Sequence, residues 1–201
     1  MLKLIVGNKN YSSWSMRAWV LLKQAEIPFE EVMLRFDAFD ASSAFKKAIC
    51  QLTPTGKVPL LLDDDLAIWD TLAIAEYLAE QFPDKHLWPQ DRAARARARS
   101  VCAEMHAGFS GLRSDVARLM SMWQSLLAEH GGPLLFGNFT IADAYFAPIC
   151  TRLKTYALPL TPTIAAYVER VLALPGVQAW IDGALTEQDF LPFEEPYRLR
   201  R

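Results

Sequence analysis

The chain has 201 residues, of which 52% are hydrophobic and 22% are charged, and its formal net charge is −2. This composition is typical of a globular protein with one large or two small domains, and it offers no electrostatic case for binding nucleic acid. No apolar run approaches the roughly 20 residues of a membrane span, and three widely spaced cysteines without a CxxC pair argue against a disulfide framework or a metal site and fit a reducing compartment.

Short apolar runs alternate with helical periodicity over the first 82 residues. The predicted strands are 2–7, 31–36, 58–62 and 66–69, and the predicted helices run from about Ser15 to Ala25, from 40 to 50 and from 70 to 82. The last two strands flank the acidic turn Asp63-Asp64-Asp65, which predicts a hairpin. The order βαβ, α, ββα indicates a thioredoxin-like domain of the α/β class at residues 1–82, with a right-handed parallel crossover in its first βαβ unit.

After residue 82 the pattern changes. Residues 83–90 contain two prolines among polar residues and are predicted to be a linker. The segments that follow are predicted helices at 91–113, 115–130, 140–155, 161–174 and 175–187. We therefore expect an all-α C-terminal domain at residues 91–201. Thr140 and Asp143 have the spacing of a capping box, and we assign them a structural role.

The start of the predicted helix at residues 70–82 is a candidate anion site. Asp70 and Thr71 are both good N-cap residues, and the backbone N–H groups of a first helical turn lack partners within the helix. The positive end of the helix dipole makes such a position suitable for a carboxylate ligand. Capping alone is the alternative role for both residues.

Pro59 stands at the start of a strand that should be buried, where a proline removes a donor of the sheet. With a cis Val58–Pro59 bond, the backbone of Val58 would turn outward and pair with an extended peptide ligand as a strand does. The sequence position alone does not choose between the cis and the trans bond.

The segment GKVPLLLDDDLAIWDTLAIAEYLAE, residues 56–80, resembles the glutathione-binding half of a glutathione transferase. That family has a Val–cis-Pro bond, a hairpin, and an acidic-Ser/Thr-x-Ala-Ile signature at the start of a helix, which here is residues 70–74. The resemblance extends over nearly the whole chain, strongly over residues 1–90 and more loosely beyond. It implies a cytoplasmic homodimer that uses glutathione as co-substrate in detoxification, with no metal and with neither nucleic acid nor membrane as partner.

The same resemblance implies binding roles for several residues. Asp70 would lie near the amine of the γ-glutamyl group, Thr71 and backbone N–H groups would hold its carboxylate, and Val58 would pair with the cysteinyl backbone beside Pro59. Lys57 would reach the glycyl carboxylate, although a solvated lysine is an equal alternative. The candidates for the electrophile site are Tyr11, Trp14, Met105, His106 and Phe109.

The stretch SSWSMRAWVLL at residues 12–22 resembles the SSCxWR helix start of zeta-class, serine-type glutathione transferases. The resemblance puts Ser12 at the position of the catalytic serine and Ser13 at the next one, with Tyr11 as a third candidate donor. A free thiol has a pKa of about 8.5, and lowering it by two units requires about 2.7 kcal/mol, which one or two hydrogen bonds to the thiolate supply. The serine would donate such a bond, and the glutathione thiolate would be the nucleophile. Plain N-capping is the alternative for both serines.

The implied reaction is attack of glutathione thiolate on an apolar electrophile in the cleft between the two domains. One alternative is a glutathione-dependent isomerase of the zeta type, acting on maleylacetoacetate-like acids, which Arg17 and Arg113 would favour if they lined the cleft. Trp14 stands where zeta enzymes have a cysteine, and this departure weighs against the isomerase. A second alternative is a transferase-like binding module without catalysis. The lack of a cysteine in residues 8–17 disfavours a thiol-transfer mechanism that uses the protein's own sulfur.

The connection between the first two helices of the second domain is unusual. Residues 91–129 contain no proline and only Gly108 and Gly111 as weak breakers, and a continuous helix there would be roughly 58 Å long. The resemblance implies two antiparallel helices joined by a loop. We therefore expect a disordered loop near Arg113–Arg118 that includes residues beyond those of the printed chain.

Overall fold

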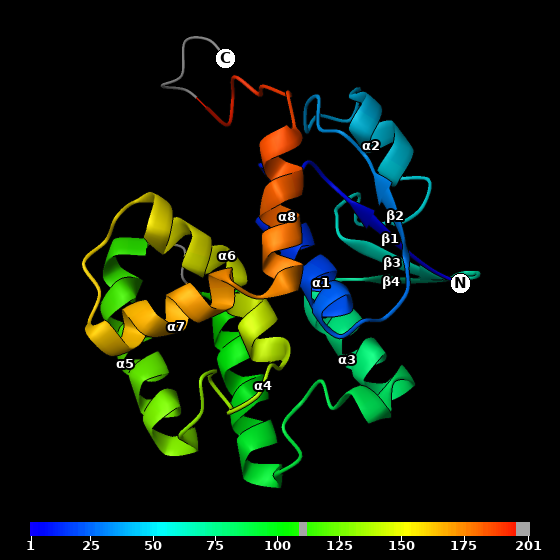
Figure 1. Ribbon diagram of the computed structural model, residues 1–201. Coiled ribbons are helices and arrows are strands. Elements are labelled where there is room, and N and C mark those ends of the chain that lie inside the picture. The colour runs from blue at the N-terminus through cyan, green and yellow to red at the C-terminus, as the bar shows by residue number, and fades with distance from the viewer. Residues whose placement is uncertain (109–111, 196–201) are drawn as a thin grey trace.

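The computed structural model describes residues 1–108 and 112–195, and for residues 112–115 it describes the backbone alone. Its N-terminal part contains β1 (Leu2–Val6), α1 (Ser13–Gln24), β2 (Glu30–Met33), α2 (Ala44–Ile49), β3 (Leu60–Asp63), β4 (Leu66–Trp69) and α3 (Thr71–Gln81). A 3₁₀ turn at Pro83–Lys85 leads to α4 (Arg92–Ala107), α5 (Leu112–His130), α6 (Ile141–Thr155), α7 (Pro162–Leu172) and α8 (Pro175–Thr186). Figure 1 shows the sheet on one side of the molecule, α4 to α7 on the other, and α1 and α8 between them.

The four strands form one mixed sheet in the order β2-β1-β3-β4. β1 pairs with β2 in parallel, with Ile5 opposite Val32, and it pairs with β3 in antiparallel, with Ile5 opposite Leu60. β3 and β4 form the predicted hairpin across the acidic turn. This arrangement confirms the predicted fold class, in which a thioredoxin-like α/β part is followed by an all-helical part.

Hydrogen bonds of side chains explain why β2 and α2 differ from their predicted bounds. β2 ends at Met33 instead of Phe36, because the Phe36 N–H donates to the side-chain oxygen of buried Asn8 at 2.7 Å and so leaves the sheet. α2 begins at Ala44 instead of at residue 40, because Ser43 is its N-cap and accepts a backbone N–H of the first turn at 3.1 Å.

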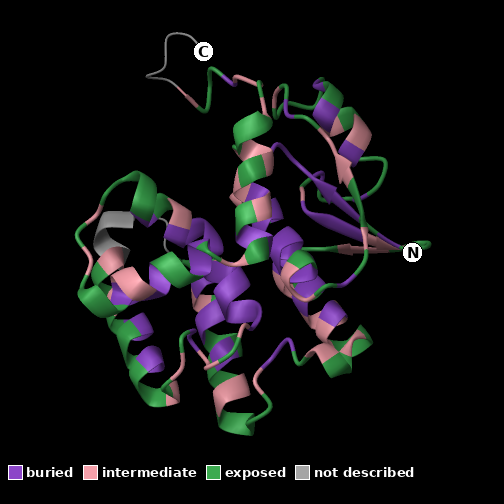
Figure 2. Cartoon of the chain, in the orientation of Figure 1, coloured by how far each residue is buried: buried purple, intermediate pink, exposed green. Residues whose placement is uncertain are grey.

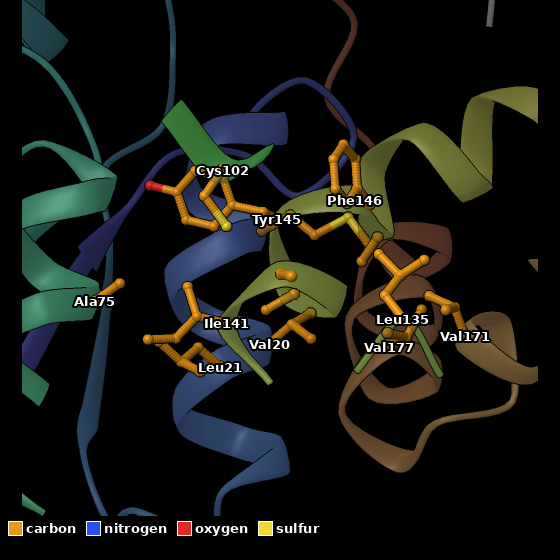
Figure 3. Packing of buried hydrophobic residues seen from close by; sticks show 14 of the residues in the cluster. Val20, Leu21, Ala75, Cys102, Leu135, Ile141, Tyr145, Phe146, Val171 and Val177 are labelled. Atoms are coloured by element: carbon orange, nitrogen blue, oxygen red, sulfur yellow. The ribbon is translucent and has the colours of Figure 1, made fainter. Parts of the chain in front are cut away.

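One large core joins the two parts of the chain. α6 is buried along most of its length and packs against α1, and Figure 2 shows the buried residues gathered where these helices meet. In Figure 3, Ile141 of α6 lies near Val20 and Leu21 of α1, and Tyr145 and Phe146 of α6 belong to the same buried cluster. Each large apolar side chain that is fully buried stabilises the fold by about 1.5–3 kcal/mol. Because the sheet and the helices of both parts contribute residues to this core, they pack as one unit. Within the described ranges, no helix is long and apolar enough to cross a membrane.

The expectation of a loop at residues 113–118 is wrong, because these residues lie within α5, which begins at Leu112. α4 ends at Ala107, and Gly108 is its C-cap, with its N–H donated to the Glu104 carbonyl oxygen at 3.0 Å. α4 therefore ends just before Gly108, the first of the two weak breakers in this part of the sequence.

Thr140 and Asp143 form the predicted capping box at the start of α6. The fully buried Asp143 carboxylate accepts from the N–H groups of Thr140 and Leu135, at 3.0 and 3.2 Å, and from the Tyr167 hydroxyl at 3.2 Å. Burial raises the pKa of Asp143 to about 6 in spite of these donors. The box thus connects the α6 helix start to the preceding loop and to α7.

Candidate functional site

A cleft of about 920 Å³ lies beside the starts of α1 and α3 and is bordered by α4. Its lining residues are Tyr11, Ser12, Trp14, Phe36, Phe39, Phe45, Lys46, Thr55, Gly56, Lys57, Val58, Pro59, Trp69, Asp70, Thr71, His106 and Glu194. Three segments that the sequence analysis selected, at residues 11–12, 57–59 and 70–71, therefore meet at one cleft.

The start of α1 is built around buried polar residues. Ser12 is the N-cap: its Oγ accepts from the Ser15 N–H at 3.2 Å and donates to the Ser15 Oγ at 2.7 Å. The Ser15 Oγ in turn accepts from the N–H of Gly7, just after β1, at 3.2 Å. Upstream, the carbonyl oxygen of Asn8 accepts from the N–H groups of Tyr11 and Ser12. The Ser12 hydroxyl thus lies at the N-terminus of a helix, in the wall of the cleft, with a second hydroxyl bonded to it.

The start of α3 contributes a second polar wall. Asp70 has a φ of 75°, which non-glycine residues seldom adopt and which is often found at functional sites. Its Oδ1 accepts from the Leu72 N–H at 2.9 Å, and its Oδ2 lies 3.1 Å from Nε2 of His106 on α4. Thr71 is buried, and its Oγ1 accepts from the hydroxyl of Tyr145 on α6 at 2.7 Å. Both residues of this helix start are therefore held by side chains of the C-terminal part.

The turn before β3 contributes the third wall. The Val58–Pro59 bond is cis, and the pairing of β3 with β1 begins only after Pro59, so Val58 lies outside the sheet ladder. Gly56 has a φ of 58°, which favours glycine, and its carbonyl oxygen accepts from Nζ of Lys46 at 2.7 Å. Lys46 and the exposed Lys57 both line the cleft, so this wall carries two positive charges.

Arg17, which would favour the isomerase alternative if it lined the cleft, is absent from the cleft lining and lies behind it. The side chain is 3% exposed, its Nε donates to the Tyr145 carbonyl oxygen at 3.3 Å, and its guanidinium lies 4.1 Å from the ring centroid of Trp14. The Trp14 ring also makes an edge-to-face contact with His106, at 5.1 Å between centroids. Burial lowers the pKa of Arg17 to about 10, so the guanidinium stays charged at neutral pH and supports Trp14 from behind.

The two electrophile-site candidates on α4, Met105 and His106, lie in different surroundings. His106 lines the cleft, as Tyr11 and Trp14 do, whereas Met105 is buried in the core and does not line the cleft. Successive side chains of a helix point about 100° apart, so one of the two faces the cleft and the other the core. Phe109 and the side chain of Arg113 lie outside the described residues.

A second cleft, of about 770 Å³, adjoins the first at Tyr11 and contains Ser13. The Ser13 Oγ accepts from the guanidinium of Arg152, an exposed residue of α6, at 3.4 Å. Tyr11 lines both clefts, and its hydroxyl contacts the Asp189 carbonyl oxygen at 3.2 Å and the Glu195 carboxylate. The neighbouring residues Ser12 and Ser13 therefore have different surroundings, and the Tyr11 hydroxyl is engaged by the C-terminal segment.

Several residues around the clefts escaped the sequence analysis because their partners are remote in the chain. Tyr145 donates a hydrogen bond to Thr71, which lies 74 positions earlier in the chain, and Lys46 donates one to the turn before β3. The segment at residues 187–195 forms hydrogen bonds with the loop before α1. No local motif distinguishes these residues from ordinary core or surface positions. Within the described part of the chain, no cluster of three or more potential metal-binding side chains occurs.

Replacing Tyr145 with phenylalanine is expected to lower the free energy of unfolding by about 1 kcal/mol, because buried Thr71 loses its hydroxyl partner. Burial raises the pKa of Tyr145 well above its usual range, so its hydroxyl is a donor at every working pH. Urea denaturation measures the change, with Tyr156→Phe as control, since Tyr156 is 60% exposed on the end of the same helix. Equal losses in the two variants would contradict the anchoring of Thr71 by Tyr145.

Comparison with known proteins gives consistent matches over most of the chain. Residues 11–81 match the family model of the glutathione S-transferase N-terminal domain, and residues 92–183 match that of the glutathione S-transferase C-terminal domain. The curated glutathione S-transferase GstB of Escherichia coli K12 is 34% identical over 153 residues, which cover 75% of this chain and 71% of that protein. A probable maleylacetoacetate isomerase of Caenorhabditis elegans is 28% identical over 172 residues, covering 75% and 78%.

Solved structures agree with these matches. The crystal structure of a glutathione transferase homolog from Burkholderia GL BGR1, with bound glutathione, has a TM-score of 0.76 and 32% sequence identity. The likeness covers 92% of this chain and 98% of that one.

Proposed function

This chain belongs to the glutathione S-transferase family, and on that premise we propose that it conjugates glutathione thiolate to an apolar electrophile. The observation that carries the proposal is the convergence of Ser12, the Val58–Pro59 turn and the Asp70–Thr71 helix start on one cleft. The glutathione bound in the similar Burkholderia protein also supports it. In this proposal residues 1–82 hold glutathione, 83–90 form the linker, and 91–201 supply the electrophile side.

The γ-glutamyl group of glutathione binds at the start of α3 in the proposed complex. Its carboxylate accepts from the Thr71 hydroxyl and from first-turn N–H groups, where the helix dipole favours a negative charge. Because Tyr145 donates to the Thr71 oxygen, the Thr71 proton is left for the ligand. The γ-glutamyl amine pairs with the Asp70 carboxylate, which also contacts the His106 side chain.

The rest of the tripeptide follows the third wall of the cleft. The cysteinyl backbone pairs with Val58 in the manner of an added strand. The glycyl carboxylate lies toward Lys57, with Lys46 as a second positive charge on the same wall. These contacts bring the cysteinyl sulfur toward Ser12.

Ser12 donates a hydrogen bond to the bound thiolate in this proposal. The two serine oxygens are 2.7 Å apart, so the bond reverses when the ligand is present: Ser15 donates to Ser12, and Ser12 donates to the sulfur. The N-terminus of α1 and the positive charge of Arg17 add to the preference for the anion. The thiol proton leaves to solvent, the sulfur–carbon bond forms, and the leaving group departs with its electron pair. The aromatic side chains of Tyr11 and Trp14, which line the cleft with Ser12, suit an apolar electrophile.

A second candidate function is a glutathione-dependent isomerase of the zeta type. The similarity to the probable maleylacetoacetate isomerase of Caenorhabditis elegans favours it, as does the exposed Arg152 beside Ser13 in the second cleft. Arg17 does not support it, since the guanidinium is buried behind Trp14. An assay of cis–trans isomerisation of a maleylacetoacetate-like acid, run in parallel with conjugation of an aryl halide, separates the two activities.

Asp70→Asn is expected to weaken glutathione binding by about 10- to 100-fold, because the charge-assisted bond to the γ-glutamyl amine is lost. Asparagine keeps the oxygen that caps α3, so the fold is retained. Calorimetric titration of glutathione measures the affinity, with Asp65→Asn in the remote hairpin turn as the matched control. Absence of binding to the wild type at millimolar glutathione would refute the transferase proposal and leave a non-catalytic module. We also expect the protein to be cytoplasmic and to form a homodimer. Sedimentation equilibrium, which measures the mass of the assembly in solution, tests the homodimer.

A further inference from the structure

Glu187, the residue that ends α8, bonds the loop that leads to Ser12. Its Oε1 accepts from the Lys9 N–H at 2.7 Å, and its Oε2 accepts from the Asn10 N–H at 3.1 Å. The Asn10 side-chain amide also donates to the Ala184 carbonyl oxygen at 2.8 Å. Two consecutive backbone N–H groups of the loop are therefore held by one carboxylate from the far end of the chain.

The N-terminal end of this loop is fixed by a different residue. Buried Asn8 accepts the Phe36 N–H on its side chain, and its carbonyl oxygen accepts the N–H groups of Tyr11 and Ser12. Between the Asn8 contacts at either end of the loop, the N–H groups of Lys9 and Asn10 donate to the Glu187 carboxylate at the end of α8. Because Ser12 follows Asn10 by two residues, a shift of the Asn10 backbone moves the Ser12 hydroxyl.

The close approach of α8 to the loop is built into the packing. A Cβ at Gly183 would come within 2.9 Å of the Lys9 Cδ, so the Lys9 side chain passes close to α8 at a glycine. That side chain continues to the rings of Trp19 and Trp180, with Nζ at 4.7 and 5.5 Å from their centroids, and it pairs with Glu31 at 2.9 Å. The Lys9 ammonium thus interacts with Glu31 and the two tryptophan rings, and the Glu187 carboxylate accepts hydrogen bonds from the backbone of the loop.

We propose that Glu187 is a positioning residue, which fixes the Lys9–Asn10 backbone so that the Ser12 hydroxyl meets the glutathione sulfur. This role rests on the proposed transferase function. It makes the end of the C-terminal helix a part of the catalytic arrangement without contact with either substrate.

The test compares Glu187→Ala and Glu187→Gln with Glu169→Gln, an exposed control on α7. For Glu187→Ala we expect kcat to fall by about tenfold or more with the KM for glutathione within about threefold, since misplacement of a catalytic group affects mainly the chemical step. The pH midpoint of thiolate absorbance, recorded at saturating glutathione, is expected to rise. Glu187→Gln keeps one acceptor oxygen and is expected to be intermediate.

Amide hydrogen exchange at Lys9 and Asn10 gives a readout that does not need glutathione. We expect faster exchange at both amides in Glu187→Ala and unchanged exchange in Glu169→Gln. Unchanged exchange at both amides, or a normal midpoint and kcat in Glu187→Ala while the wild type ionises glutathione, overturns this role alone. Failure of the wild type to ionise glutathione overturns the proposed function, and the role of Glu187 with it.

Discussion

Ser12→Ala is expected to lower kcat at pH 7 by about 100-fold or more, which is the usual cost of removing one preorganised donor to a developing or bound anion. Without the hydroxyl, the pKa of bound glutathione returns toward the free value of about 8.5, and only a few per cent of the thiol is ionised at neutral pH. The α1 dipole and Arg17 retain part of the effect, so the loss is not complete. The KM for glutathione is expected to change little, because the proposed binding contacts lie at residues 57–59 and 70–71.

Thiolate absorbance against pH and steady-state kinetics between pH 6.5 and 9.5 measure this result. The activity difference between wild type and Ser12→Ala is expected to narrow as pH rises, since the thiol then ionises without help. Ser13→Ala is the control, because Ser13 lies in the second cleft and contacts Arg152. A larger loss in Ser13→Ala than in Ser12→Ala would assign the donor to Ser13.

The same substitution has a separate cost in stability. Ser12 is the N-cap of α1, so its loss is expected to reduce the free energy of unfolding by about 1 kcal/mol. Kinetics are therefore compared at a temperature where both proteins are folded, and circular dichroism checks this.

Asp143→Ala is expected to be the most destabilising substitution, at about 3–5 kcal/mol at pH 7. The carboxylate is fully buried and accepts from two backbone N–H groups and two hydroxyls, those of Thr140 and Tyr167. Alanine leaves these four donors buried without their acceptor. For a chain of this size the loss corresponds to a fall in Tm of roughly 10 °C.

The effect of Asp143→Ala is also expected to depend on pH. Burial raises the folded-state pKa of Asp143 to about 6, above the unfolded value of about 3.9. Between these values the folded state binds more protons, so the contribution of Asp143 to wild-type stability falls as pH rises from about 4 to about 6. The destabilisation in Asp143→Ala is therefore expected to be up to about 3 kcal/mol larger near pH 4 than above pH 7.

Urea denaturation of wild type and variant at several pH values tests both statements. The other carboxylates are the same in both proteins, so the difference between the two free energies of unfolding reports the contribution of Asp143 alone. Asp182→Ala on the exposed face of α8 is the control, and its effect is expected to stay within about 0.5 kcal/mol. A pH-independent difference would mean that the pKa of Asp143 is not raised in the folded protein.

Local chemistry allowed much of the fold to be predicted. The hairpin of β3 and β4, the Asp70 start of α3 and the capping box of Thr140 and Asp143 all agree with the structure. Each rests on interactions between residues a few positions apart, which are the same wherever the segment lies. Predictions that needed a partner from elsewhere were less accurate: β2 ends early because Asn8 captures the Phe36 N–H, and the break before α5 lies at a glycine that looked weak.

The sequence by itself determined which segments line the cleft: the start of α1, the turn before β3 and the start of α3. Capping residues and a proline before a strand are local signals at residues 70–71 and 58–59, and the resemblance to the family selected Ser12 at the start of α1. Only the tertiary structure decided how they meet. The packing of α4 against α3 and α6 turns His106 toward Asp70 and Met105 into the core. The position of α6 brings Tyr145 to Thr71, and the packing of α8 on α1 brings Glu187 to the loop before Ser12. These contacts depend on the angles and distances between packed elements, and no short stretch of the chain encodes them.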